Sequence, residues 1–216
     1  MKRAVRTPFF FRFFNPENLV SRMPDDEQAI YLTFDDGPVP EVTPEVLRIL
    51  ADRQVGATFF MVGDNIRKHP ETFEQVVAAG HAVGNHTFHH LNGWKIAPAA
   101  YVEDVMRVRA YSDTHLFRPP YGRFTPSQYM ILKKDFRFVV WSLLTWDFSP
   151  HVTPEECLQM AIQNTRPGEI VVFHDSLKAQ KNLLYALPRY LDEFRGRGYA
   201  FKLLETKKQR IPGSLR

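Results

Sequence analysis

Short apolar runs alternate with amphipathic segments along most of this chain. The apolar runs are rich in β-branched and aromatic residues, and each stops at a polar or turn-forming sequence, as buried strands do. They span residues 29–34, 57–62, 81–85, 116–118, 138–142, 169–174 and 199–203. We therefore predict seven buried strands.

Segments with helical signals separate these runs. Thr43-Pro44-Glu45 has the N-cap residue, the proline and the early acid with which helices begin, and Gly80 ends another such segment. The predicted helices span residues 43–53, 70–80, 99–110, 126–134, 154–164 and 182–197. This alternation predicts a single α/β domain with a parallel sheet, closed into a barrel or left open, and with reactive groups beyond the C-terminal ends of the strands.

Polar side chains gather where five of the predicted strands end. Because the C-terminal ends of parallel strands meet at one edge of a sheet, we expect these clusters to lie together. Each cluster alone has an ordinary explanation, since Asp-Asp-Gly-Pro, for example, is also a typical turn. Their coincidence predicts a functional site. The clusters are Asp35-Asp36, His86 with His90, Arg118 to Gly122, Trp146-Asp147 and His174-Asp175.

Two of these clusters have the composition of a metal site. Residues at i and i+4 lie on one face of a helix, so a helix through His86 and His90 would direct both imidazoles at one ion. Asp36 can supply a third ligand, which leaves a coordination position open, as in catalytic zinc sites. Asp35 then remains free for proton transfer. Zinc is the favoured ion, with cobalt, nickel and manganese as alternatives for this ligand set.

Composition and charge exclude some classes of protein. The chain is 44% hydrophobic and 24% charged, and no apolar run approaches the roughly 18 to 20 residues of a membrane span. The net charge of +4 comes from Lys and Arg that are spread along the chain, except for the tail around residues 207–210, so nucleic acid is not an expected partner. A single cysteine, Cys157, cannot form an intrachain disulfide, which fits a reducing compartment.

The two ends of the chain differ from the regular alternation. Residues 1–28 form an aromatic and basic segment in which Arg12 interrupts the apolar run and no small-residue cleavage site follows, so we expect no signal peptide. We expect this segment to pack on or flank the domain at residues 29–206, with peripheral membrane contact as an alternative, and we expect residues 207–216 to form a basic tail. The predicted location is cytoplasmic or leaderless and peripheral. The oligomeric state is left open.

The motifs in this order resemble the polysaccharide deacetylase family with the NodB-homology domain, also called carbohydrate esterase family four. The matching motifs are Thr-Phe-Asp-Asp-Gly-Pro at 33–38, His-Thr-x-x-His at 86–90, Arg-x-Pro-Tyr-Gly at 118–122 and a hydrophobic-His-Asp motif at 172–175. The resemblance spans roughly residues 29 to 204. It implies a distorted (β/α) barrel with its active site at the C-terminal ends of the strands.

The resemblance also implies roles for individual residues. Asp35 is expected to be the catalytic base, oriented by Arg118, while Asp36, His86 and His90 are expected to hold the metal ion. This agrees with the ligand set that the residue types and their spacing indicate.

The remaining roles concern the oxyanion, the leaving group and the substrate. By resemblance, the backbone N–H of Tyr121 helps to hold the oxyanion and His174 is the general acid. An imidazole must be charged to act as an acid, and a buried carboxylate such as Asp147 would keep it so by raising its pKa. Trp146 lies beside these residues and is a candidate for contact with the sugar.

The chain departs from the family at the fourth motif, which usually reads Asp-x-x-Asp-Trp. Here Leu144 replaces the first aspartate, and Phe148 replaces the tryptophan. Phe148 can still form an apolar wall under an acetyl methyl group.

These residues predict a metal-dependent hydrolase that removes acetyl groups from N-acetylated sugars, such as N-acetylglucosamine in chitin-like or peptidoglycan-like glycans. One alternative is hydrolysis of another non-peptide C–N bond, in a cyclic imide or ureide. A second alternative is a non-catalytic carbohydrate-binding protein, although such a protein would not need a base, three ligands and an acid together.

Overall fold

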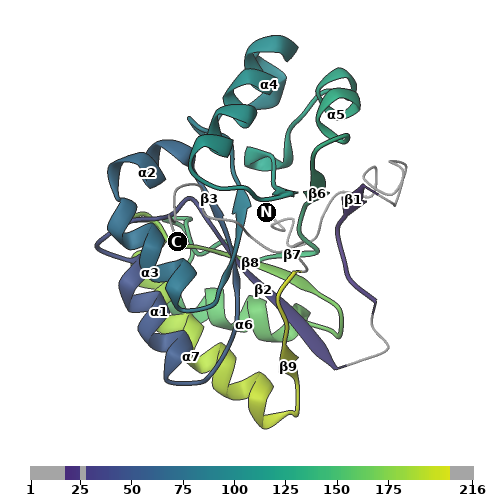
Figure 1. Cartoon of the computed structure of the whole chain (residues 1–216). Helices are drawn as coiled ribbons and strands as arrows, with labels where there is room; N and C mark the ends of the chain where they lie inside the picture. The colour runs from purple at the N-terminus through teal and green to yellow at the C-terminus, as the bar shows by residue number, and fades with distance from the viewer. Residues whose placement is uncertain (1–17, 25–27, 205–216) are drawn as a thin grey trace.

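A parallel sheet with helices packed around it forms the centre of the computed structural model, which describes residues 18–24 and 28–204 (Figure 1). The order of the strands is β1-β6-β5-β4-β3-β2-β8-β7, and β9 pairs with β2 away from this path. All of these pairings are parallel. The strands are β1 (Leu19–Val20), β2 (Ala29–Asp35), β3 (Thr58–Met61), β4 (Ala82–Asn85), β5 (Leu116–Phe117), β6 (Arg137–Val139), β7 (Leu143–Leu144), β8 (Ile170–His174) and β9 (Ala200–Phe201).

The predicted fold class is confirmed, and the described residues contain two short strands more than the seven predicted. β1 was not predicted, and the run at 138–142 is divided into β6 and β7. The link between β6 and β7 connects the two ends of the strand order. At its start the Val140 N–H donates to Val20 O of β1, and at its end the Ser142 N–H donates to Ile170 O of β8. The chain itself therefore joins the two ends of the sheet, which produces a distorted barrel.

Helices cover the outside of the sheet (Figure 1). The six predicted helices are present, and the short helix α2 was not predicted because its sequence places only Gly63 and Ile66 in the interior. Thr125 and Thr153 cap α5 and α6 through capping boxes. The helices are α1 (Thr43–Ala51), α2 (Gly63–Lys68), α3 (Pro70–Ala78), α4 (Pro98–Arg107), α5 (Pro126–Leu132), α6 (Pro154–Asn164) and α7 (Gln180–Gly196).

One predicted cap is wrong. Thr43 does not cap α1, because its hydroxyl instead donates to the Asp175 carboxylate at 2.6 Å and accepts the Val39 N–H at 2.8 Å. The start of α1 is thereby attached to the end of β8.

Aromatic side chains fill the interior between the sheet and the helices. The Phe34 ring stacks on Phe59 at 4.8 Å and on Phe173 at 6.3 Å between ring centroids, so three neighbouring strands share one aromatic layer. A second cluster, which includes Tyr101 and Phe138, packs beneath α4 and α5. Both clusters are buried and hold the strands in a fixed register.

The register of the strands aligns the predicted site residues. Asp35 is the residue of β2 that pairs with His174 of β8, and Met61 of β3 pairs with Asn85, which directly precedes His86. Asn85 in turn pairs with Phe117, which precedes Arg118. The side chains of the predicted clusters therefore emerge at one edge of the sheet.

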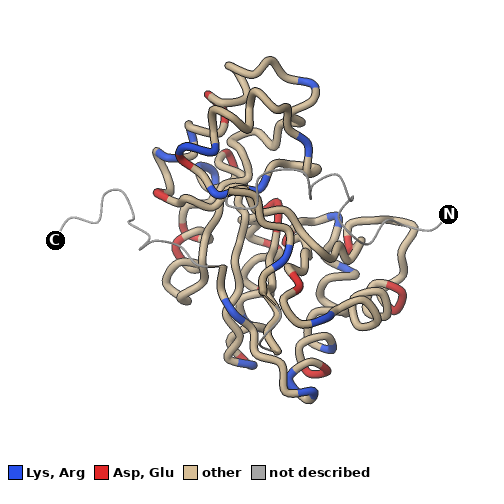
Figure 2. The backbone as a smooth tube through the Cα atoms, turned by 90° about the vertical axis from the view of Figure 1, so that its right-hand side faces the viewer, with Lys and Arg blue, Asp and Glu red and all other residues tan. Residues whose placement is uncertain are grey.

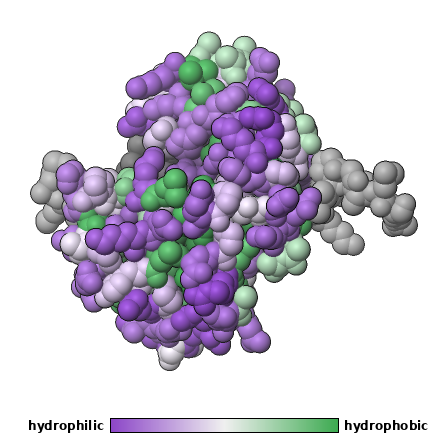
Figure 3. All heavy atoms as spheres, turned by 90° about the vertical axis from the view of Figure 1, so that its left-hand side faces the viewer, coloured by the Kyte–Doolittle hydropathy of each residue, from purple (hydrophilic) through white to green (hydrophobic). Residues whose placement is uncertain are grey.

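Charged residues of both signs are spread along the described chain (Figure 2). Lys and Arg alternate with Asp and Glu along the backbone in Figure 2. Seen from the side of Figure 1 on which α1 to α3 lie, the surface is mainly hydrophilic, with apolar side chains in its middle (Figure 3). Among the described residues, no helix has the length and apolar character needed to cross a bilayer.

The predicted segments at the two ends are described only in part. Within residues 1–28, β1 pairs with β6, while residues 1–17 and 25–27 lie outside the described residues. The predicted basic tail at 207–216 also lies outside them.

Candidate active site

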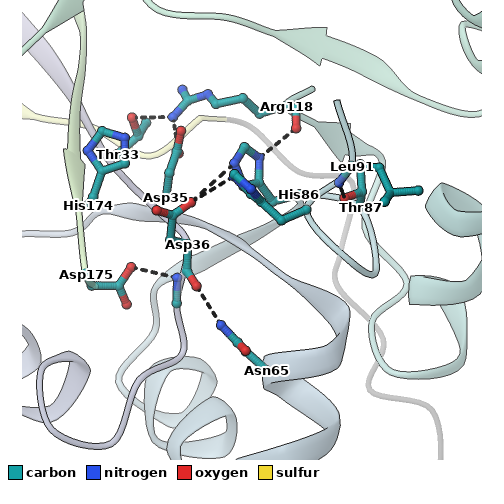
Figure 4. A network of polar contacts seen from close by, with 12 residues as sticks. Thr33, Asp35, Asp36, Asn65, His86, Thr87, Leu91, Arg118, His174 and Asp175 are labelled. Carbon is teal, nitrogen blue, oxygen red and sulfur yellow. Dashed lines mark hydrogen bonds and ion pairs between the residues drawn. The ribbon is translucent and has the colours of Figure 1, made fainter. Parts of the chain in front are cut away.

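A buried arginine holds the first of the two adjacent aspartates. Arg118 Nη1 donates to Asp35 Oδ1 at 2.6 Å and to Thr33 Oγ1 at 2.8 Å, and its Nε donates to the carbonyl of Val139 at 3.1 Å (Figure 4). The guanidinium also lies 4.0 Å from the centre of the Phe60 ring. Arg118 is fully buried, so its charge is compensated mainly by Asp35, and the pair fixes the direction of this carboxylate.

The second aspartate lies against both predicted histidine ligands. Asp36 Oδ1 is 3.1 Å from His90 Nε2 and 3.7 Å from His86 Nε2, and one ligand atom from each of the three residues lies within 4.8 Å of the others. Burial alone would raise the pKa of Asp36, but the hydrogen bond from His90 and the nearby His174, His86 and His90 lower it well below its usual value. The Asp36 side chain is therefore ionised at neutral pH.

The hydrogen bonding of His86 prepares it to bind a metal. Its Nδ1 lies 2.7 Å from the carbonyl oxygen of Arg118, which can only accept, so Nδ1 carries the proton and the lone pair of Nε2 faces Asp36. Burial lowers the pKa of His86 to about 4, so the imidazole is neutral, as a metal ligand must be. The donor set of two imidazoles and one carboxylate fits a divalent transition ion.

The two histidines do not lie on one face of a helix, as their spacing of four had suggested. Residues 86–90 form a loop after β4, in which Thr87 and His90 have left-handed backbone angles, with φ of 62° and 55°. The N–H groups of Phe88 and His89 donate to Asp104 Oδ1 at 2.8 and 3.0 Å instead of to helical carbonyls. The spacing of four brings the imidazoles together through a bent loop.

Asp104, on α4, was not predicted as part of the site. Besides accepting the two backbone N–H groups, it contacts His89, whose Nδ1 lies 2.5 Å from its Oδ2. The carboxylate is buried and holds the loop between the two predicted ligands by three hydrogen bonds. No short motif marks this residue, because it lies 14 residues beyond His90 on another element.

A second buried carboxylate positions His174. Asp147 Oδ1 is 2.8 Å from His174 Nδ1, and Oδ2 accepts the backbone N–H of His174 at 2.7 Å. Burial would lower the pKa of His174, but the charge and hydrogen bond of Asp147, with smaller contributions from Asp36 and Asp35, raise it to about 9. His174 is therefore protonated at neutral pH.

The residue after His174 completes the frame of the site. Asp175 is buried, and its Oδ1 accepts the Gly37 N–H at 3.1 Å. A Cβ at Gly37 would lie 2.0 Å from the Asp175 carboxylate, so only glycine fits between Asp36 and this side chain. Burial raises the pKa of Asp175 to about 8 despite the hydrogen bond from Thr43.

These groups open into a pocket of about 240 Å³. Its lining combines Asp35, Asp36 and the three histidines with apolar side chains. Arg118 and Asp147 lie behind the pocket and act through Asp35 and His174. The apolar and remaining lining residues are Tyr121, Trp141, Leu144, Phe148 and Lys178.

Two lining residues were missed from the sequence. Trp141 was assigned to the interior of a predicted strand, but this strand is interrupted between β6 and β7, and the ring lines the pocket. Gly122 is close enough that a Cβ there would lie 2.9 Å from the Trp141 ring. Lys178 follows β8 and is exposed. Neither residue belongs to a recognisable motif.

Tyr121 lines the pocket, whereas Trp146 does not. The Tyr121 ring is exposed and meets the His90 ring edge to face, with 4.9 Å between centroids. Trp146 is absent from the lining residues and packs against Phe148 at 5.5 Å and against the core. Phe148 lines the pocket as expected and contacts the His174 ring at 4.8 Å.

Left-handed backbone angles concentrate at this site. Of the six non-glycine residues with positive φ among the described residues, only Gln54 lies away from the predicted clusters. Such angles cost on the order of 1 to 3 kcal/mol each and persist where surrounding contacts impose them. The hydrogen bond from Asn65 Nδ2 to Asp36 O, at 2.8 Å, is one of these contacts. The site residues are Asp36, Thr87, His90, Tyr121 and Trp146.

The fold and site together define a class of protein in which a parallel α/β barrel carries paired carboxylates and histidines at the C-terminal ends of its strands. Comparisons assign the family. The sequence profile of the polysaccharide deacetylase family matches residues 22–135, more than half of the chain. The chain belongs to this family.

Individual relatives agree with this assignment. A peptidoglycan-N-acetylglucosamine deacetylase of Bacillus cereus is 32% identical over 189 residues, which is 83% of this chain and 87% of that protein. A chitooligosaccharide deacetylase of Azorhizobium caulinodans is 34% identical over 72% of this chain and 77% of its own length. A crystal structure of a peptidoglycan N-acetylglucosamine deacetylase superposes with a TM-score of 0.81 at 28% identity and covers 90% of this chain and 94% of its own.

Proposed function

We propose that this protein is a metal-dependent hydrolase that removes acetyl groups from N-acetylglucosamine units of a glycan. The observation that carries the proposal is the position of a base, a ligand set and an acid around one pocket: Asp35, the cluster of Asp36, His86 and His90, and His174. The names of the relatives, which are peptidoglycan and chitooligosaccharide deacetylases, support the same substrate class.

Asp36, His86 and His90 would hold the divalent ion. When bound, such an ion makes a water more acidic and polarises a carbonyl oxygen. The ligand set leaves room for further ligands, as catalytic sites do. Zinc suits these donors, and cobalt, nickel and manganese are alternatives.

We assign Asp35 as the base. Its Oδ1 is engaged by Arg118 at 2.6 Å, while the carboxylate also lines the pocket beside Asp36. In this mechanism Asp35 removes a proton from the attacking water, and Arg118 keeps the carboxylate oriented for the transfer.

In this mechanism the backbone N–H of Tyr121 stabilises the negative charge that develops on the acetyl oxygen. Its backbone has a φ of 60° in a turn closed by the Gly122 N–H, which donates to the Pro119 carbonyl at 3.0 Å. A backbone N–H held in such a turn at the rim of the pocket is a preorganised donor.

His174 completes the reaction as the acid. Its raised pKa keeps it protonated, its Nδ1 is held by Asp147, and the ring lines the pocket. In this mechanism His174 gives its proton to the amine as the C–N bond breaks, and Asp147 stabilises the charged imidazole beforehand.

The apolar wall accounts for selection of a small acyl group. Trp141, Leu144 and Phe148 line the same pocket as the carboxylates. Such a wall suits the methyl group of an acetyl, and Leu144 supplies apolar surface where the family usually has an aspartate.

The first test is acetate release from N-acetylglucosamine oligomers. The purified protein is stripped of metal with a chelator, dialysed and reloaded with zinc or cobalt. We expect acetate from the reloaded protein and at most a few per cent of that rate from the stripped protein. Equal release from both would exclude metal dependence. No release with any ion would favour another C–N substrate or a carbohydrate-binding protein.

A further inference from the structure

Lys178 lies at the junction of three cavities. It lines the catalytic pocket and also two neighbouring cavities. The first neighbour, which we call the lysine cavity, is lined by Ser149, His151, Thr153, Lys178, Lys181 and Asn182, among others. The second shares Asp36, His90 and Lys178 with the catalytic pocket and extends to Asp64 and Asn65. Lys178 is therefore within reach of a substrate that extends from the catalytic pocket into either neighbour.

The charges that line these cavities are unequally compensated. Asp35 is paired with Arg118, and Asp64 is paired with Arg67 and Lys68 at 2.8 and 2.6 Å. Asp36 is engaged by the two histidines. By contrast, no carboxylate in the described part of the chain forms a salt bridge with Lys178 or Lys181, and both side chains are exposed. The lysine cavity therefore presents uncompensated positive charge.

The backbone that carries the two lysines is fixed relative to the catalytic acid. Lys178 is four residues after His174, and Lys181 lies in the first turn of α7. The next residue, Asn182, is buried, and its Nδ2 donates to the carbonyls of Asp147 and Val152 at 2.9 and 3.0 Å. The same loop that positions His174 therefore sets the place of Lys178 and Lys181.

We propose that Lys178 and Lys181 form a subsite for a carboxylate on the glycan, carried by a sugar that adjoins the one losing its acetyl group. The inference rests on the proposed function and specifies the substrate class. A glycan of N-acetylglucosamine alone is neutral and leaves the two lysines uncompensated. An acidic glycan places a carboxylate against them, and this attraction favours its binding.

The test compares two oligosaccharides of equal length. Both alternate N-acetylglucosamine with N-acetylmuramic acid, but in one of them the carboxylates are converted to amides. We measure kcat/KM for each with the metal-loaded protein and take the ratio of acidic to amidated substrate. We expect Lys178→Ala with Lys181→Ala to lower this ratio about tenfold, because single exposed ion pairs are worth up to roughly fivefold. The control Lys134→Ala changes an exposed lysine at a distant cavity and should keep the wild-type ratio.

A third oligosaccharide that carries a stem peptide distinguishes a carboxylate of the sugar from a carboxylate of the peptide. If the wild type prefers the acidic to the amidated oligosaccharide when neither carries a peptide, the subsite binds the carboxylate of the sugar. The inference is overturned if the wild type does not prefer the acidic oligosaccharide, or if the double variant keeps the wild-type preference. Calorimetric binding of both oligosaccharides to the same proteins distinguishes this failure from failure of the proposed function, because binding preference is measured even where no acetate is released.

Discussion

At the scale of single residues, the site depends on buried carboxylates that each control one functional group. Asp35 is fixed by Arg118, and Asp147 fixes His174. Both pairings were expected, the first from the family resemblance and the second because a buried carboxylate would keep His174 charged. It did not predict Asp104, whose partners are backbone N–H groups that any residue supplies.

Asp147→Asn should move the alkaline limit of activity. In the proposed mechanism His174 acts while protonated, so we expect wild-type activity below the His174 pKa of about 9 and its loss as the pH rises through that value. Asn removes the charge that raises the pKa of His174, while burial still lowers it. The falling limb of kcat/KM should therefore shift to lower pH by at least about one unit, and activity at pH 8 should fall about twofold or more.

The control for this experiment is Phe148→Leu. Phe148 contacts the same imidazole but carries no charge, so its replacement should leave the position of the alkaline limb unchanged. An unshifted limb in Asp147→Asn would show that Asp147 does not set the protonation of His174.

At the scale of elements, most strands and helices were predictable from local sequence, whereas the loops were not. The apolar runs of β2, β3, β4 and β8 ended where the structure ends them to within one or two residues. The division of the run at 138–142 was not predictable, because β7 forms through pairing with β8, far away in sequence. The loop at 86–90 was not predicted, because a spacing of four residues does not distinguish a turn of helix from a loop held by Asp104.

Asp104→Ala should weaken metal binding through this loop. Removing the carboxylate leaves the N–H groups of Phe88 and His89 without their acceptor, so His86 and His90 are held less firmly. We expect the dissociation constant for zinc to rise about 10- to 100-fold, the range for partners that support metal ligands. The measurement is competition with a chromophoric chelator.

Thr114→Val provides the matched control for general destabilisation. The buried Thr114 hydroxyl donates to Val83 O and accepts the Leu116 N–H, but it does not contact the loop. This variant should lose comparable stability in thermal unfolding and retain wild-type zinc affinity. Equal zinc affinities in the two variants would contradict a role for Asp104 in holding the ligands.

At the scale of the whole molecule, the parallel register converts motifs far apart in sequence into one site. β2, β8, β4 and β5 end at the same edge, which places Asp35, His174, His86 and Arg118 together. This arrangement was predictable because the alternation of strands and helices implies it. The apolar wall at Trp141 was not, since it depends on how the chain crosses between the two ends of the sheet.

The most direct test of the account measures zinc binding and acetate release on the same preparations of the wild type, Asp35→Asn and His86→Ala. We predict that Asp35→Asn binds zinc like the wild type but releases acetate at least about 100-fold more slowly, since general base catalysis contributes roughly that factor. His86→Ala should lose both properties. Undiminished zinc binding in His86→Ala, or wild-type acetate release by Asp35→Asn, would contradict the assignment of these residues as ligand and base.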